Sequence, residues 1–126
     1  MKYHDYHLIG YEVGDSGEKI TLRLELPIGV GQIDRSMIEF SGVAFYQFQH
    51  TAGAIIVDLA EVASREVILQ NREMIEWCAQ NIGVRDWPGN FEQYLEHIGS
   101  KDLRGWLVES AIGFYGCIVA KNVSQV

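Results

Sequence analysis

Residues 37–61 limit the fold most tightly, because they hold the densest run of β-branched and aromatic residues in the chain. They predict two long strands, over 37–50 and 54–59, joined by a turn at Thr51-Ala52-Gly53. Both faces of the first strand are partly apolar towards its middle, which is typical of a central strand with helices on at least one side. Gly42 lies inside this strand and predicts a bulge or a bend there.

Two further strands are expected before this stretch. Residues 5–13 predict the first, and the turn cluster Gly14-Asp15-Ser16-Gly17 ends it. Apolar and polar residues then alternate strictly over 19–26, which predicts a strand with one buried and one wet face. Pro27 is expected to end that strand, and residues 27–36 are expected to form a loop.

Helical spacing begins after Val62. Residues at intervals of three and four predict one helix from Ser64 to Ile82, with Gly83 at its C-terminal end. Its predicted buried stripe consists of Val67, Ile68, Asn71, Met74, Ile75, Cys78 and Ile82. A second, shorter helix is expected from Asn90, with Gln93 completing a capping box. Its predicted buried side consists of Phe91, Tyr94, Leu95 and Ile98.

The last stretch, residues 103–123, predicts two more strands that turn near 111–113. A helix over 103–112 stays open as an alternative, because an internal glycine costs a helix only about 1 kcal/mol. The expected fold is therefore a single α+β domain over residues 1–126, with the order ββββααββ. Its antiparallel sheet has about six strands, and two helices pack on one face.

Composition narrows the functional class. The chain has 126 residues, 48% of them hydrophobic and 21% charged, which is typical of a globular domain. Its net charge of −7 argues against nucleic-acid binding, because neutralising phosphates requires a surplus of Lys and Arg. No run approaches the ~18 apolar residues of a membrane span. Cys78 and Cys117 lie far apart among apolar residues and predict reduced core thiols in a cytoplasmic protein.

Motifs for known chemistry are missing from the sequence. It contains no phosphate loop, dinucleotide fingerprint, HExxH or GxSxG motif. His4 and His7 would point to opposite faces of an extended strand, so they do not predict a shared metal ion. We therefore expect neither a metal site nor a cofactor, and no catalytic residue is assigned.

One set of residues supports a small-ligand or enzymatic site as an alternative. His50 ends one predicted strand and Asp58 lies on the next, so a hairpin would let Asp58 orient His50 as a base. Tyr46, Phe48 and Trp106 would line the same sheet face. The opposing interpretation is structural, because strand aromatics more often form core or cross-strand pairs.

The segments IEFSGVAFYQFQH, IIVDLAEV and GFYGCIVA follow one another in the chain after an opening YHLIGYEV. In this layout the chain resembles small uncharacterised bacterial α+β proteins of the immunity type. The resemblance implies a cytoplasmic protein without catalytic activity. Immunity proteins of this kind bind and block a cognate toxin.

The leading hypothesis is therefore a non-enzymatic binding protein, such as an immunity-like inhibitor, whose acidic surface meets a basic toxin domain. Carboxylates for that contact lie on or between the two predicted helices: Glu73, Glu76, Asp86, Glu92 and Glu96. A homodimer assembled through sheet edges is a third possibility.

Overall fold

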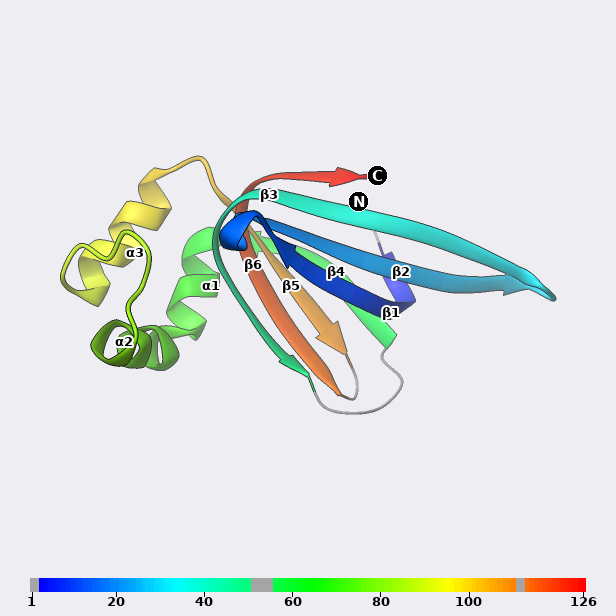
Figure 1. Cartoon of the computed structure of the whole chain (residues 1–126), viewed down its shortest axis with the longest axis horizontal. Coiled ribbons are helices and arrows are strands. Elements are labelled where there is room, and N and C mark those ends of the chain that lie inside the picture. Colours follow the sequence, from blue (N-terminus) through cyan, green and yellow to red (C-terminus); the bar gives the residue numbers. More distant parts are fainter. Residues whose placement is uncertain (1–2, 51–55, 111–112) are drawn as a thin grey trace.

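The computed structural model describes residues 3–50, 56–110 and 113–126, and it contains six strands and three α-helices within these ranges (Figure 1). The strands are β1 (Tyr3–Gly14), β2 (Lys19–Gly29), β3 (Gln32–His50), β4 (Ile56–Ala63), β5 (Arg104–Ser110) and β6 (Phe114–Gln125). A short 3-10 turn, η1 (Asp15–Gly17), joins β1 to β2. The helices are α1 (Ser64–Gln70), α2 (Arg72–Asn81) and α3 (Phe91–Ser100).

The six strands form a closed antiparallel barrel in the order β1-β2-β3-β6-β5-β4. The predicted open α+β sheet with two helices on one face is therefore wrong. The reason is that β4 does not return beside β3: it pairs with β1 and β5, so the sheet closes on itself as a Greek key. The helices lie together outside the barrel, at the left of Figure 1.

The predicted loop over residues 27–36 is also wrong, because this segment is a β-hairpin. The ladder of β2 and β3 continues past Pro27, which pairs with Ile33, to Gly29 opposite Gln32. Pro27 is tolerated because this part of β2 pairs only with β3. The hairpin projects from the barrel as an arm and exposes Ile28 and Val30 near its tip (Figure 1).

The helix predicted over residues 64–82 is split in two at Asn71. The Asn71 backbone leaves the helical region (φ −107°, ψ 18°). Its buried side chain donates hydrogen bonds to the Val67 carbonyl oxygen (2.7 Å) and to the Cys117 Sγ (3.4 Å). Asn71 thus anchors the break to β6, which apolar periodicity alone does not reveal. Ile82, expected on the buried stripe, is 74% exposed.

Other local predictions are confirmed. Gly83 follows α2 at φ +102°, and its amide donates to the Cys78 carbonyl oxygen (2.6 Å). The Asn90 Oδ1 accepts from the Gln93 amide (2.8 Å) at the start of α3. Residues 104–110 form strand β5, so the helical alternative there is wrong. The turns expected at 51–53 and 111–112 lie outside the described residues.

Gly42 shows why β3 changes direction. It has φ +62°, and the register between β3 and β6 shifts between Val43 and Phe45, as the sequence predicted for this point of the strand. A Cβ at Gly42 would lie 2.9 Å from the Lys121 Cβ. The bend leads β3 away from β2, since the β2–β3 ladder ends at Ser41 while the β3–β6 ladder runs on to His50.

Two hydrophobic clusters hold the fold together. One fills the barrel interior and includes Phe40, Ile118 and Trp106; the other lies between the barrel and the helices and includes Ile68, Tyr94 and Val119. Cys78 and Cys117 are both free, as predicted, and burial raises the pKa of the Cys117 thiol to about 11. Because side chains occupy the barrel interior, functional groups must be sought on its outer surface.

Among the described residues, none of the helices has both the length and the apolar character needed to cross a lipid bilayer.

Candidate functional site: a groove beside strand β3

His50 and Asp58 do not form the predicted pair. His50 ends β3, whose neighbours are β2 and β6, whereas Asp58 lies on β4 between β1 and β5. The Asp58 Oδ1 instead lies 3.4 Å from the His4 Nδ1 and accepts from the Asp5 amide (3.1 Å). The hairpin assumed from chain order does not exist, because β4 crosses to the opposite side of the barrel from β3 and pairs there with β1 and β5.

The predicted aromatic lining is divided between two places. Phe48 contacts Tyr46 and also the ring of Tyr11, at centroid distances of 5.8 and 4.8 Å, and His50 lies 5.6 Å from Phe114. Trp106 is only 3% exposed and packs inside the barrel. The five residues therefore do not converge on one ligand site, although Tyr46, Phe48 and His50 belong to one aromatic cluster.

Metal ligands are likewise not gathered in the described part of the chain. No group of three or more His, Cys, Asp or Glu side chains within it is arranged to hold a metal ion.

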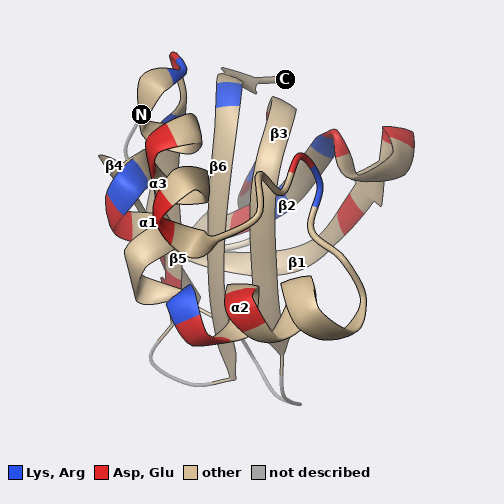
Figure 2. Cartoon of the chain, turned by 90° about the vertical axis from the view of Figure 1, so that its left-hand side faces the viewer, with Lys and Arg blue, Asp and Glu red and all other residues tan. Residues whose placement is uncertain are grey.

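The five predicted carboxylates fall into two groups. Arg72 forms ion pairs with two of them, since it lies 3.0 Å from Glu76 and 2.8 Å from Glu92. The pKa of Glu92 is lowered by its own backbone amide and then by Arg72. The other three carboxylates are exposed and form no ion pair within the described ranges. We call them the carboxylate face: Glu73, Asp86 and Glu96. Acidic residues on α2 and α3 face the viewer in Figure 2.

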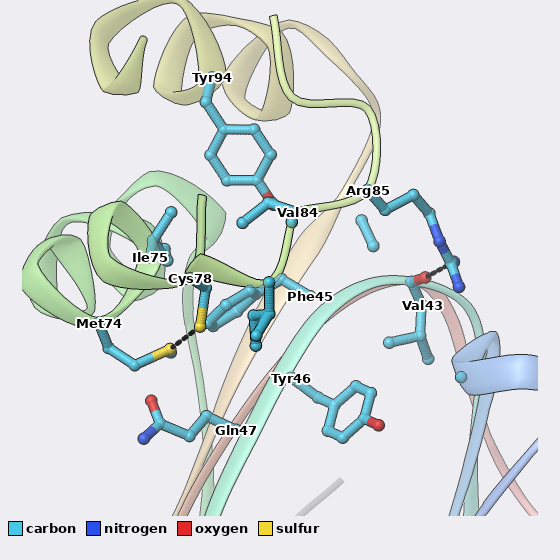
Figure 3. A pocket seen from close by; sticks show the side chains of 14 residues that line it. Val43, Phe45, Tyr46, Gln47, Met74, Ile75, Cys78, Val84, Arg85 and Tyr94 are labelled. Carbon is cyan, nitrogen blue, oxygen red and sulfur yellow. Dashed lines mark hydrogen bonds between the residues drawn. The ribbon is translucent and has the colours of Figure 1, made fainter. Parts of the chain in front are cut away.

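The three helices α1, α2 and α3 form a layer outside the barrel, which we call the helical layer (Figure 1). An open groove of about 370 Å³ lies between β3 and this layer (Figure 3). We call it the β3 groove. One wall is the β3 segment 43–47, the other is α2 with the turn that follows it, and Gly17 of η1 closes one end. The residues lining the helical wall are Met74, Ile75, Cys78, Ile82, Gly83, Val84, Arg85 and Tyr94.

Arg85 ties the end of the groove to the barrel. Its guanidinium donates to the Ser16 carbonyl oxygen (2.8 Å) and to the Val43 carbonyl oxygen (3.4 Å), the latter drawn as a dashed line in Figure 3. The same group lies 3.6 Å from Glu18. These three contacts link the turn after α2 to η1, to Glu18 and to β3 at this end of the groove.

Tyr94 reaches the groove from α3 and is 1% exposed. Its hydroxyl has no hydrogen-bond partner in the part of the chain that the structure describes. Burial raises the pKa of Tyr94 to about 12, with a further contribution from the charge of Asp86. The hydroxyl is therefore a neutral donor, available to a polar atom that enters the groove.

We expect the Tyr94 titration to be visible in alkali. Because the folded pKa lies above the ordinary value of 10, the stability this group contributes is complete below pH 10 and falls as pH rises towards 12. Ultraviolet difference titration should show one tyrosine ionising near pH 12, and Tyr94→Phe should remove that step alone. A Tyr94→Phe protein that keeps the step would contradict the assignment.

Sequence patterns did not reveal the β3 groove, because its two walls are 27 or more residues apart and meet only through the barrel (Met74 against Gln47). One local signal pointed to it. The apolar stripe of the predicted helix includes Met74, Ile75, Cys78 and Ile82, and all four of these residues line the groove.

Comparisons with known proteins found no matching family model, no similar curated protein and no similar solved structure.

Proposed function

We propose that this protein is a non-enzymatic binding protein whose partner is a basic protein domain. One observation carries the proposal. The helical layer forms a wall of the open β3 groove, and the same layer bears the carboxylate face, whose side chains form no ion pair in the described residues. An apolar hollow with charges at its margin is the usual anatomy of a protein interface.

The charges favour a cationic partner. The chain carries −7 overall. On the helical layer, Arg72 pairs with Glu76 and Glu92, Arg85 lies near Glu18, and Arg65 lines the same hollow as Glu96. Glu73 and Asp86 thus act as uncompensated negative charges. They would accelerate association with a basic surface and discourage acidic ones.

An immunity-type inhibitor of a basic toxin is the form of this proposal that the sequence resemblance favours. Such a protein needs a rigid surface and no catalytic groups, which agrees with an interior filled by apolar side chains. A cytoplasmic site of action also belongs to the proposal, since two free thiols are compatible with a reducing compartment.

The test is charge reversal on the carboxylate face. We expect Glu73→Lys with Asp86→Lys to weaken binding at least tenfold at low salt, mainly through slower association, because four units of charge change beside the groove. Glu76 is left unchanged, because reversing it would oppose Arg72 and affect the fold. The ligand is a purified basic domain, sought first among the products of neighbouring genes, and surface plasmon resonance at two salt concentrations gives the rates.

The matched control is Asp102→Lys with Glu109→Lys, which makes the same charge change at exposed residues outside α2 and the turn that follows it. Its affinity should fall much less, and it should keep the wild-type free energy of unfolding within about 1 kcal/mol. The first double should stay within about 2 kcal/mol, because Asp86 has a φ of 58° that lysine adopts less readily than aspartate. Equal weakening by the two doubles would mean that net charge alone matters, and the carboxylate face would lose its assigned role.

A further inference from the structure

Strand β3 is unevenly paired along its length. It pairs with β2 over residues 32–41 and with β6 over residues 38–50, so after the bend at Gly42 its only ladder partner is β6. The Val43 amide still donates to the Glu18 carbonyl oxygen (3.1 Å). Past Val43, no backbone hydrogen bond from the other side of β3 to another element is present in the described ranges. We call this side of residues 44–50 the free edge.

The sequence of the free edge lacks the residues that normally protect a strand edge. Residues 44–50 read AFYQFQH and contain no proline, no lysine and no other charged residue except a titratable histidine at the end. Natural proteins normally protect exposed strand edges with such residues or cover them with another element. In an antiparallel pair, alternate residues direct their amide and carbonyl groups away from the partner. Alternate residues of 44–50 therefore present backbone donors and acceptors on the side away from β6.

The free edge and the β3 groove occupy the same place. Residues 43–47 form one wall of the groove, and the turn after α2 faces them across it (Figure 3). An extended chain that entered here would find strand hydrogen bonds on one side and apolar contacts from Met74 and Cys78 on the other. The Tyr94 hydroxyl, which has no hydrogen-bond partner in the described residues, would supply one further donor.

We propose that the β3 groove binds an extended segment of the basic partner, which adds as a strand to the free edge of β3. This inference rests on the proposed function and specifies the mode of binding. Strand addition uses main-chain hydrogen bonds for affinity and pockets under alternate side chains for specificity. The bound segment therefore carries apolar side chains at every second position, with Lys or Arg flanking them opposite Glu73 and Asp86.

The probe is a library of random linear decapeptides displayed on phage and selected on the full-length protein. We expect enriched peptides to alternate apolar residues and to contain Lys or Arg. The best of these, made synthetically, should slow hydrogen exchange at alternate amides of residues 44–50. Slower exchange at every second amide identifies strand pairing, because a peptide that docks through side chains alone does not protect alternate amides.

Two controls make the test specific. N-methylation of single peptide amides should weaken binding at least tenfold at every second position and little at the others, which requires no change in the protein. Cys78→Phe should fill the groove and also weaken binding tenfold, whereas Gln80→Phe, on the exposed surface of the same helix, should not.

Each other outcome overturns the inference. Strand addition would be excluded if the selected peptides bind without protecting alternate amides of residues 44–50. It would also be excluded if the selection enriches no peptide. A doubled mass in solution with a protected free edge and no peptide would show that a second copy occupies it. In all these cases the response to Glu73→Lys with Asp86→Lys still tests the proposed function separately, because that experiment uses the folded partner.

Discussion

Trp106→Ala is expected to destabilise the protein by about 3 to 5 kcal/mol, because it removes a large side chain from the filled interior of the barrel. Trp106 is 3% exposed, and its ring meets the Phe40 ring edge to face at 5.0 Å. The Arg104 guanidinium covers the same ring from outside, 5.0 Å from its centroid. A cavity at this position cannot collapse easily, since the strands around it are fixed by their ladders on both sides.

The free energy of unfolding, measured by urea titration, checks this prediction. Trp77→Ala is the matched control, because Trp77 lies on α2 and is 58% exposed, and we expect it to cost less than about 1 kcal/mol. Trp106→Phe should recover part of the loss. A loss below about 1 kcal/mol for Trp106→Ala would return Trp106 to the role of an exposed ligand-lining residue, which the sequence allowed.

Sequence reasoning succeeded where a structural feature depends on neighbours in the chain. Ile20, Leu22 and Leu24 are buried on one side of β2, as their alternation predicts. The Asn90 cap and the glycine after α2 were recognised for the same reason, since each acts within one helical turn. The bend at Gly42 also has a local cause, because a non-glycine residue rarely adopts its positive φ.

Closure of the barrel could not be derived in this way. Whether β4 pairs with β3 or crosses to β1 depends on the fit between segments about 50 residues apart, such as Tyr3 opposite Leu59. The assumed β3–β4 hairpin placed His50 beside Asp58 and so created a candidate site that the fold does not contain. Conversely, the β3 groove exists only because β2 pairs with residues 32–41 of β3, whereas β6 pairs with residues 38–50.

The carboxylates of the candidate site show the same difference between local and long-range information. All five carboxylates were identified from charge and helical position, yet the partner of Glu92 is Arg72, twenty residues away on another helix. Ion pairing between helices depends on how the helices pack. The sequence could therefore not separate Glu76 and Glu92, which pair with Arg72, from the residues of the carboxylate face. That separation determines which charge reversals are informative.

Gly105→Ala is expected to destabilise the protein by about 2 to 3 kcal/mol, in the upper part of the usual range for overpacking a core. Gly105 is buried on β5, opposite Val62 of β4. An added Cβ would lie 2.9 Å from the Val62 carbonyl oxygen and 3.2 Å from that of Ala63, where β4 passes into α1. It would also meet the Val67 Cγ2 at 2.9 Å. The backbone oxygens cannot move without shifting the start of the helical layer.

Gly10→Ala is the matched control, because Gly10 also lies in a strand and an added Cβ there meets nothing within 4 Å. We expect it to be neutral or slightly stabilising, since alanine reduces the freedom of the unfolded chain. Urea titration of the two variants separates the effect of contact from that of losing a glycine. If both variants lose equal stability, close packing of α1 on β5 is not what requires glycine at position 105. If Gly105→Ala alone loses stability, the close packing of β5 against the start of α1 requires glycine at position 105.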